Sequence, residues 1–181
     1  EFKGDGRDRF VSVNVGPGTK LPSLGHVDYD TLEDDYAVQC GGGIAGGADS
    51  IRIVNCQDPL QIKAAINGAQ RACREAGTDT PILVQVTVET TGTMLVGSDI
   101  AAATTVVQAY DIPLMGLNCA SGPQEMAEHV RWLGENWSGL IGVRPNAGLP
   151  ELIDGKTHYP LTPDELANWQ ERFIEEDGGN L

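Results

Sequence analysis

The cysteine at position 119 is the residue whose surroundings point most directly to chemistry. The run Leu-Met-Gly-Leu-Asn-Cys-Ala-Ser-Gly-Pro spans residues 114–123 and places Cys119 where a buried strand is expected to end and a helix to begin. A thiol at a helix N-terminus lies among unpaired backbone N–H groups and at the positive end of the helix dipole, and both favour the thiolate. A thiolate acts either as a nucleophile or as a metal ligand.

Other polar side chains also follow apolar runs, as Cys119 does. They are Asn14, Asn55, Glu89, Thr90, Asn118 and Asn146. In repeated βα units such residues lie at the carboxyl ends of parallel strands. If the strands form a (β/α)8 barrel, its active site lies at those ends. We take Asn118, Asn146 and Glu89 as candidate substrate-binding residues. The alternatives are that the two asparagines only terminate a strand and a turn, and that Glu89 is an exposed loop carboxylate.

The three histidines and the other three cysteines show no catalytic or metal-binding spacing. Surface or turn roles are expected for His26, His129 and His158, which are scattered along the chain. The other cysteines show no close pairing, so free thiols are expected at Cys40, Cys56 and Cys73. Cys56 also ends a strand, and we expect it to be structural. No Ser-His-Asp arrangement and no Gly-x-Ser-x-Gly elbow suggest a serine hydrolase.

Composition excludes several classes of partner. The chain has 181 residues, enough for one compact domain, with 12 Lys and Arg against 26 Asp and Glu, a formal net charge of -14. Such an acidic chain is not expected to bind nucleic acid, because few cations are available to displace counterions. No stretch is long and apolar enough to span a bilayer, and no signal peptide opens the chain, so we expect a cytoplasmic enzyme with no membrane partner.

Strand-like apolar runs alternate with helical patterns along the chain. The expected strands are residues 10–15, 50–54, 82–88, 114–118 and 139–143. Two helices begin at Asp58-Pro59 and Thr162-Pro163, where Gln61 and Glu165 complete capping boxes. The first ends at Gly77 and buries a face comprising Leu60, Ala64, Ile66, Ala69 and Cys73, and the last buries Leu166, Trp169, Phe173 and Ile174.

One further helix follows Asp30 and has a less regular sequence. Its apolar stripe comprises Leu32, Tyr36, Cys40 and Ile44. Three glycines, Gly41 to Gly43, interrupt this stripe. Each glycine lowers helix stability by roughly 1 kcal/mol relative to alanine, so a local break is expected there.

Two architectures fit this repetition of strands and helices. In a (β/α)8 barrel the carboxyl ends of the strands converge on one mouth. A doubly wound open sheet would usually carry a glycine-rich phosphate loop after its first strand. The loop at residues 16–20, Gly-Pro-Gly-Thr-Lys, fits that motif poorly, because a proline interrupts it and no helix follows at once. The barrel is therefore favoured.

Five segments resemble one family in a single register from about Arg9 to the C-terminus. They are Gly16-Pro-Gly-Thr-Lys-Leu-Pro-Ser-Leu-Gly-His26, Cys56-Gln-Asp-Pro-Leu-Gln-Ile-Lys-Ala-Ala65, Val84-Gln-Val-Thr-Val-Glu-Thr-Thr-Gly-Thr-Met94, Gly116-Leu-Asn-Cys-Ala-Ser-Gly-Pro123 and Pro145-Asn-Ala-Gly-Leu-Pro150. Together they are similar to the homocysteine S-methyltransferase domain of cobalamin-dependent methionine synthases.

The resemblance implies a fold, a reaction and a metal site. It implies a (β/α)8 barrel in which three cysteines bind zinc, the zinc activates the thiol of homocysteine, and methylcobalamin, held by another module, supplies the methyl group. Cys119 matches the first zinc ligand. The other two ligands implied by the resemblance form an adjacent cysteine pair at the last strand, and this chain has no such pair.

The chain also departs from the family pattern. The match corresponds to strands three to seven, so residues 1–181 are expected to form a single incomplete barrel domain, an excerpt of a longer polypeptide and inactive alone. Val54 stands where the family usually has a glutamate that holds the homocysteine amino group, and Val13-Asn14-Val15-Gly16 stands where small residues are usual. The alternatives are a non-catalytic or degenerate βα fragment and, third, an enzyme with Cys119 as a covalent nucleophile.

Overall fold

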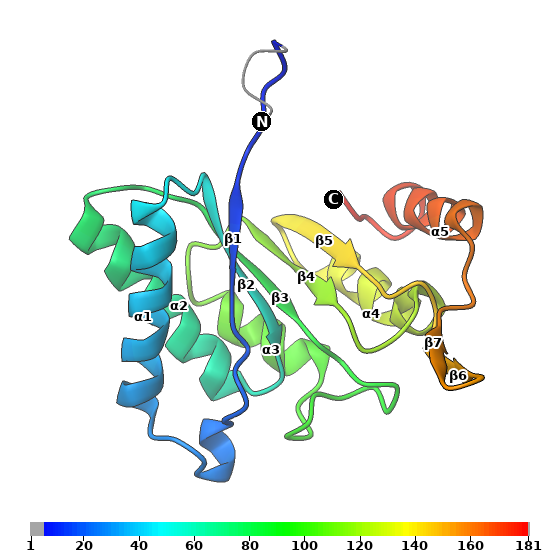
Figure 1. Cartoon of the computed structure of the whole chain (residues 1–181), viewed down its shortest axis with the longest axis horizontal. Helices are drawn as coiled ribbons and strands as arrows, with labels where there is room; N and C mark the ends of the chain where they lie inside the picture. The colour runs from blue at the N-terminus through cyan, green and yellow to red at the C-terminus, as the bar shows by residue number, and fades with distance from the viewer. Residues whose placement is uncertain (1–5, 181) are drawn as a thin grey trace.

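Five parallel strands form the central sheet of the structure (Figure 1), a computed structural model that describes residues 6–180. They are β1 (Ser12–Val15), β2 (Ser50–Cys56), β3 (Ile82–Val86), β4 (Leu114–Asn118) and β5 (Leu140–Arg144), and they neighbour one another in chain order. The predicted bounds of β4 agree at both ends, and those of the other strands agree to within two residues.

Helices connect the strands and follow the sheet. They are the short 3-10 helix η1 (Pro22–Leu24) and the α-helices α1 (Tyr29–Ala45), α2 (Pro59–Ala76), α3 (Ile100–Val107), α4 (Pro123–Asn136) and α5 (Pro163–Glu175). Within residues 6–180, none of the helices is both long and apolar enough to cross a membrane.

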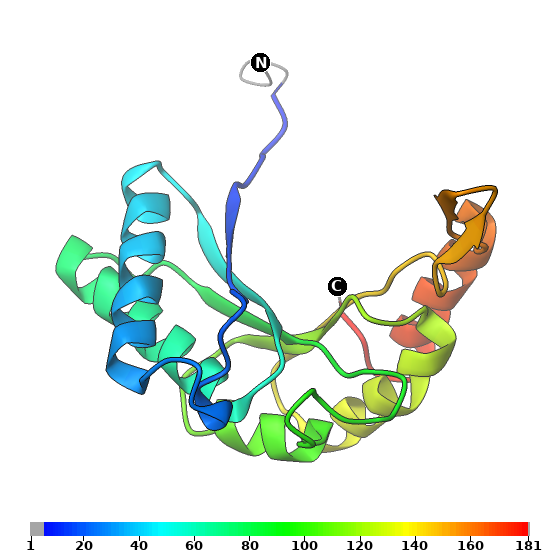
Figure 2. The ribbon, with the colours of Figure 1, turned by 60° about the horizontal axis from the view of Figure 1, so that its bottom comes forward.

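The strand order decides between the two predicted architectures. Each connection moves the chain one strand further in the same direction, whereas a doubly wound sheet reverses direction at a switch point. Because βα crossovers are right-handed, connections in one direction place their helices on one face of the sheet. Figure 2 shows α1 to α4 along the outer side of the curved sheet. The chain therefore folds as part of a (β/α)8 barrel, as the sequence predicted.

The hydrophobic core lies between the sheet and these helices. Along β2, Ile51 and Ile53 are fully buried, whereas Arg52 between them is half-buried. Since side chains alternate across a strand, the isoleucines face the helices and Arg52 faces the inner side of the arc. The outer face is therefore apolar and covered, while the inner face carries polar and charged groups.

Close packing of α1 corrects the expectation of a break at Gly41 to Gly43. The helix is continuous, because Gly43 packs directly on β1: a Cβ there would lie 2.6 Å from a methyl group of Val13. The neighbouring helix approaches equally closely, and a Cβ on Gly68 of α2 would lie 2.7 Å from the carbonyl oxygen of Glu33. Tertiary contact thus offsets the low helix propensity of glycine.

Of the two predicted capping boxes, one is confirmed and one is wrong. Thr162 and Glu165 make the reciprocal hydrogen bonds of a capping box. Asp58 does cap α2, but the Gln61 side chain accepts its hydrogen bond from the backbone N–H of Gln57 rather than from that of Asp58. Gln61 is diverted because its amide group also donates to a neighbouring loop, described below.

Several apolar residues are more exposed than the sequence predicted. Leu60, in the first turn of α2, is 39% exposed and Ile174, in the last turn of α5, is 58% exposed. Phe10 and Val11 are 81% and 62% exposed, and β1 begins only at Ser12. Since β1 pairs only with β2 in the described part of the chain, no strand or helix covers these two side chains.

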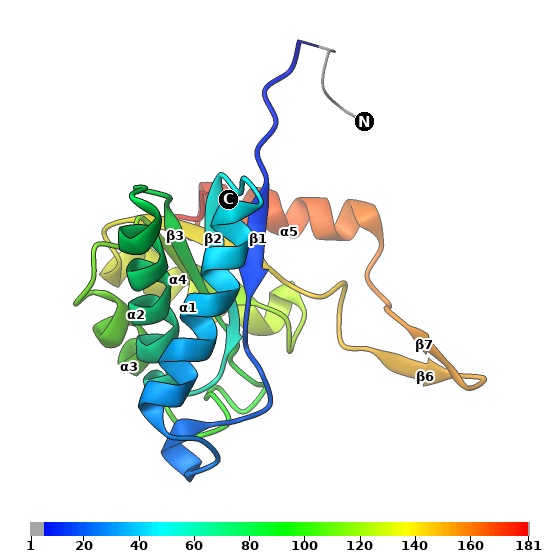
Figure 3. The ribbon, with the colours of Figure 1, turned by 60° about the vertical axis from the view of Figure 1, so that its left-hand side comes forward.

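The C-terminal part adds a hairpin and a helix. Strands β6 (Glu151–Ile153) and β7 (Lys156–His158) form an antiparallel hairpin that projects from the body of the protein (Figure 3). Helix α5 contacts α4, and Phe173 is buried with its ring centroid 5.8 Å from that of the half-buried Trp169. Cys73 of α2 is buried, as predicted.

We predict that Gly68→Ala destabilises the fold by about 1–3 kcal/mol, because the new methyl group would overlap the backbone of α1. Gly42→Ala is the matched control: nothing lies within 4 Å of a Cβ there, so the higher helix propensity should stabilise the protein by about 0.5–1 kcal/mol. Urea unfolding monitored by circular dichroism measures both changes. Equal free energies of unfolding for the two variants would contradict the close helix contact.

Candidate functional site

A small cavity of about 200 Å³ lies at the carboxyl ends of the strands. It is lined by Asn14 from β1, Val54 and Asn55 from β2, Asn118 and Cys119 from the end of β4, and Arg144 from β5. The structure thus brings together four of the polar residues that the sequence placed at strand ends, which are Asn14, Asn55, Asn118 and Cys119. They converge because parallel strands present their carboxyl ends at one edge of the sheet.

A bulge in β2 shapes one wall of this cavity. Between the pairs Ile53–Val84 and Cys56–Val86 the register shifts, so that β2 has one residue more than β3. Asn55 lies in this bulge with a left-handed backbone (φ 59°). A bulge redirects a side chain and leaves a backbone group without a ladder partner.

The side chain of Asn118 provides a hydrogen-bond partner for the backbone of this bulge. Its Oδ1 accepts a hydrogen bond from the backbone N–H of Asn55 at 3.1 Å, and its Nδ2 donates to Asn55 Oδ1 at 2.8 Å. The hydroxyl of Thr87, just after β3, donates to the carbonyl oxygen of Asn118 at 2.9 Å. Asn118 therefore joins the ends of β2, β3 and β4. It is only 5% exposed, so these bonds form largely away from water.

Cys119 lies in a loop rather than at a helix N-terminus, which corrects the prediction. Residues 120–122 separate it from α4, whose N-cap is Gly122. Its backbone is left-handed (φ 58°), and its N–H donates to the carbonyl oxygen of Arg144 at 3.1 Å. The Asn118 amide donates to its sulfur at 3.5 Å. The thiol is half-buried and lines the cavity, so a small molecule there can reach it.

Two arginines that the sequence analysis did not single out face the interior of the arc. Arg144 lines the cavity, and Arg52 lies two residues before Val54 on the same face of β2. Burial and the nearby positive charge of Arg144 lower the pKa of Arg52 from its usual value. The alternation Ile51-Arg52-Ile53 was the signal for an inward-facing charge, because the isoleucines mark the covered face.

Two candidate substrate-binding residues lie outside the lining of this cavity. Glu89 is half-buried in the loop after β3, where the Gln57 amide donates to its carboxylate. Asn146 is half-buried after β5, and its backbone N–H donates to the carbonyl oxygen of Ser121 at 3.1 Å. Their roles toward substrate stay predictions. Thr90 is exposed.

The loop at residues 16–20 makes contacts within the protein. The carbonyl oxygen of Pro17 accepts hydrogen bonds from the Tyr36 hydroxyl at 3.0 Å and from the Gln61 amide at 2.6 Å. These contacts fasten the loop to α1 and α2. They favour the structural interpretation of this loop over a phosphate cradle.

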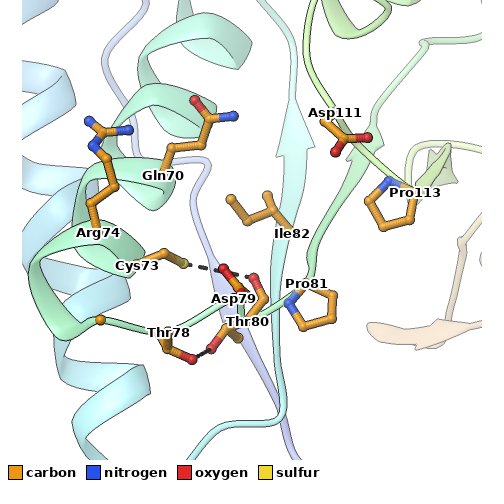
Figure 4. A pocket seen from close by; sticks show the side chains of 11 residues that line it. Gln70, Cys73, Arg74, Thr78, Asp79, Thr80, Pro81, Ile82, Asp111 and Pro113 are labelled. Atoms are coloured by element: carbon orange, nitrogen blue, oxygen red, sulfur yellow. Dashed lines mark hydrogen bonds between the residues drawn. The ribbon is translucent and has the colours of Figure 1, made fainter.

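A larger cavity, of about 630 Å³, lies at the opposite, amino ends of the strands (Figure 4). The side chains around it include Cys73, Asp79 and Asp111, and the Cys73 thiol donates to the carbonyl oxygen of Thr80 at 3.7 Å. In barrels this end supports the fold and the carboxyl end carries the chemistry. The smaller cavity around Cys119 is therefore the candidate site.

Metal-ligating groups are sparse around Cys119. Within residues 6–180, no group of three or more His, Cys, Asp or Glu side chains is placed to hold a metal ion. The cavity lining offers one thiol and three carboxamides. Because a zinc site needs three or four protein ligands, these residues do not form a complete zinc site.

Comparison with known proteins assigns the chain to a family. The family model described as homocysteine S-methyltransferase matches residues 1–181. The chain belongs to this family. Among its relatives are a methionine synthase from Mycobacterium tuberculosis, 50% identical over 175 residues and 97% of this chain, and one from Mycobacterium leprae, 49% identical over 173 residues and 96% of this chain. The matched part is only 15% and 14% of the length of these relatives.

Solved structures of the homocysteine methyltransferase MmuM from Escherichia coli share the fold. The apo form matches with a TM-score of 0.63 at 15% identity, and the metallated form with 0.58 at 14% identity. Each match covers 77% of this chain, and 50% or 49% of the MmuM chain. At this identity the likeness concerns the fold alone, and it agrees with a half-barrel.

We predict that Cys119 is the first thiol to react when the native protein is alkylated at about pH 8. Burial raises the pKa of Cys40 and Cys56 to about 12, and it also raises that of Cys73. Since only the thiolate reacts, a raised pKa slows alkylation at a given pH. Peptide mass spectrometry after iodoacetamide treatment measures the order, with urea-unfolded protein as the control in which all four thiols react. Labelling of Cys56 as fast as Cys119 would contradict the structure.

Proposed function

We propose that this chain forms part of the homocysteine-binding unit of a methionine synthase, in which Cys119 contributes one thiolate ligand to a zinc ion. The observation that supports this most directly is the position of Cys119 in the cavity at the carboxyl ends of the strands. The chain is also about half identical to two methionine synthases over nearly its whole length. In this proposal methylcobalamin, bound by another module, is the methyl donor.

The proposal requires groups from outside the described residues. Strands β1 and β5 each have one neighbour in the described sheet, so we propose that residues 1–181 are one incomplete barrel domain, which further strands complete. The additional zinc ligands would come with those strands. Alone, the chain is expected to be inactive. The cytoplasmic location expected from the sequence also stays a prediction.

Zinc would supply one kind of chemistry here: it stabilises the thiolate of a bound thiol near neutral pH. The residues of this chain have other tasks. The hydrogen bonds from Asn118 to Asn55 fix the wall beside Cys119, and the bond from the Cys119 N–H to the Arg144 carbonyl fixes the backbone that carries the thiol. Such supporting contacts hold a ligand in the orientation that a metal requires.

We predict that Cys119→Ser, made in the whole protein that carries this chain, lowers zinc content and slows methylation of homocysteine by at least about 100-fold, because even supporting residues of metal sites cost about 10–100-fold. Cys73→Ser is the matched control, since its side chain lies at the opposite end of the strands and serine can keep the hydrogen bond to Thr80. Zinc is measured by plasma mass spectrometry, and methylation by the methionine formed.

Two outcomes separate the alternatives. If the unmodified protein neither holds zinc nor methylates homocysteine, the non-catalytic interpretation replaces the proposal. If it methylates homocysteine, and alkylation of Cys119 stops the reaction while all the zinc stays bound, Cys119 is a nucleophile and the proposed ligand role is wrong.

We also predict that Asn118→Ala destabilises the fold by about 1–3 kcal/mol, because the N–H of Asn55 would lose its hydrogen-bond acceptor. In the proposed enzyme, zinc affinity should fall as well, by about 10–100-fold, because Cys119 would lose its support. Asn136→Ala is the control: this residue is exposed on α4, and its side chain donates to the carbonyl oxygen of Trp132 in its own helix. Unchanged zinc affinity in Asn118→Ala would contradict the supporting role.

A further inference from the structure

The charges around the Cys119 cavity are one-sided. Among residues 6–180, Arg144 is the single charged residue in its lining, which otherwise consists of three asparagines, one cysteine and Val54. No carboxylate lines the cavity, although the chain as a whole has a formal net charge of -14. The cavity therefore has a local charge opposite in sign to that of the whole chain.

The second inward-facing arginine adds to this charge. Arg144, whose own side chain is exposed, is near enough for its positive charge to lower the pKa of Arg52, in addition to the larger effect of burial. Among residues 6–180, the buried Nε atom of Arg52 has no hydrogen-bond acceptor, and neither arginine takes part in an ion pair. Unpaired like charges of this kind are stabilised by a bound anion.

The cavity has room for a small anion. A volume of about 200 Å³ accommodates a molecule of a few heavy atoms beside Cys119 and Arg144. Cys119 and Arg144 line the same space, and the backbone N–H of the first is bonded to the carbonyl of the second at 3.1 Å. A ligand in this cavity therefore lies beside both residues, and its sulfur and its carboxylate can each face one of them.

The lining gives an ammonium group no matching partner. Val54 is apolar and 7% exposed, and the asparagine side chains near it are neutral, with Asn55 and Asn118 already bonded to each other. Two guanidinium groups would repel a third cation. An amino group on the ligand would therefore find no charge to pair with among these residues.

We propose that Arg144, supported by Arg52, determines the specificity of the site by binding the carboxylate of a small thiol carboxylic acid, and that the residues of this chain do not require an amino group on that acid. This inference rests on the proposed function, because it takes the ligand to be the thiol that is methylated. Arg144 is a substrate-binding residue in this scheme. Arg52 does not touch the ligand, and its positive charge strengthens the attraction of the site for a carboxylate.

Three thiols of matched length test the inference: homocysteine, 4-mercaptobutanoate, which lacks the amino group, and 3-aminopropane-1-thiol, which lacks the carboxylate. We expect the whole protein, measured by isothermal titration calorimetry, to bind 4-mercaptobutanoate at least as tightly as homocysteine and the aminothiol at least about tenfold more weakly. In Arg144→Gln, the dissociation constant for 4-mercaptobutanoate should rise about tenfold or more while that for the aminothiol does not rise.

Arg74→Gln is the matched control, because it removes the same charge from an exposed position at the opposite end of the strands. Its preference among the three thiols should equal that of the unmodified protein. The inference is wrong if 4-mercaptobutanoate binds at least tenfold more weakly than homocysteine, or if no thiol binds. It is also wrong if Arg144→Gln leaves unchanged the ratio of the dissociation constants for 4-mercaptobutanoate and the aminothiol.

The same titrations separate this inference from the proposed function. If homocysteine is bound and methylated but the aminothiol binds as well as 4-mercaptobutanoate, the enzyme assignment stands and the role of Arg144 is wrong. If 4-mercaptobutanoate binds in an Arg144-dependent manner but no thiol is methylated, the carboxylate site stands and the proposed reaction is wrong.

Discussion

The hydrogen bonds between Asn118 and Asn55 are the interaction on which the site depends most. They join β4 to a bulge in β2 across the end of β3, and Thr87 adds a bond from β3 itself. Of the four described non-glycine residues with positive φ, three are Asn55, Cys119 and Ala120, all next to these bonds. A left-handed backbone costs roughly 1–2 kcal/mol for Cys119 and Ala120 and less for an asparagine such as Asn55, and the hydrogen bonds of Asn118 and Cys119 offset that cost. Backbone strain of this kind is typical of functional sites.

The rest of the fold divides the protein into a structural side and a chemical side. Helices α1 to α4 cover the outer face, where close contacts such as that of Gly68 on Glu33 bring two helices together. The inner face carries Arg52, Gln85 and Asn118, which a purely structural core would not need. Gln85 shows the cost of polar groups there: its Nε2 donates to the carbonyl of Gly142 at 3.2 Å, but its buried Oε1 has no partner among residues 6–180.

Local signals were sufficient to predict much of the fold. The apolar run at 114–118 and the Thr-Pro-Asp-Glu sequence at 162–165 correctly predicted β4 and the start of α5, because apolar runs and capping are properties of neighbouring residues. Prediction failed where distant contacts decide. The continuity of α1 through Gly43 depends on packing against Val13. The Gln61 side chain hydrogen-bonds the carbonyl of Pro17 and does not complete a capping box.

The site was predictable to a similar extent. Parallel strands were sufficient to predict that Asn14, Asn55, Asn118 and Cys119 would converge, and they do. The loop between Cys119 and α4 was not predictable, because it requires two consecutive left-handed residues that are not glycine. Arg144 was missed because the residues that line the cavity with it come from other strands, and no local pattern shows that proximity.

The central claim is that Cys119 is one of the sulfur ligands of a zinc ion in a homocysteine-methylating unit. Zinc X-ray absorption spectroscopy on the whole protein, before and after Cys119→Ser, tests it most directly, because zinc–sulfur scattering at about 2.3 Å counts the thiolate ligands. We predict that the sulfur contribution in the unmodified protein falls by one ligand in the variant wherever zinc is retained. An unchanged sulfur contribution at full zinc occupancy would contradict the claim.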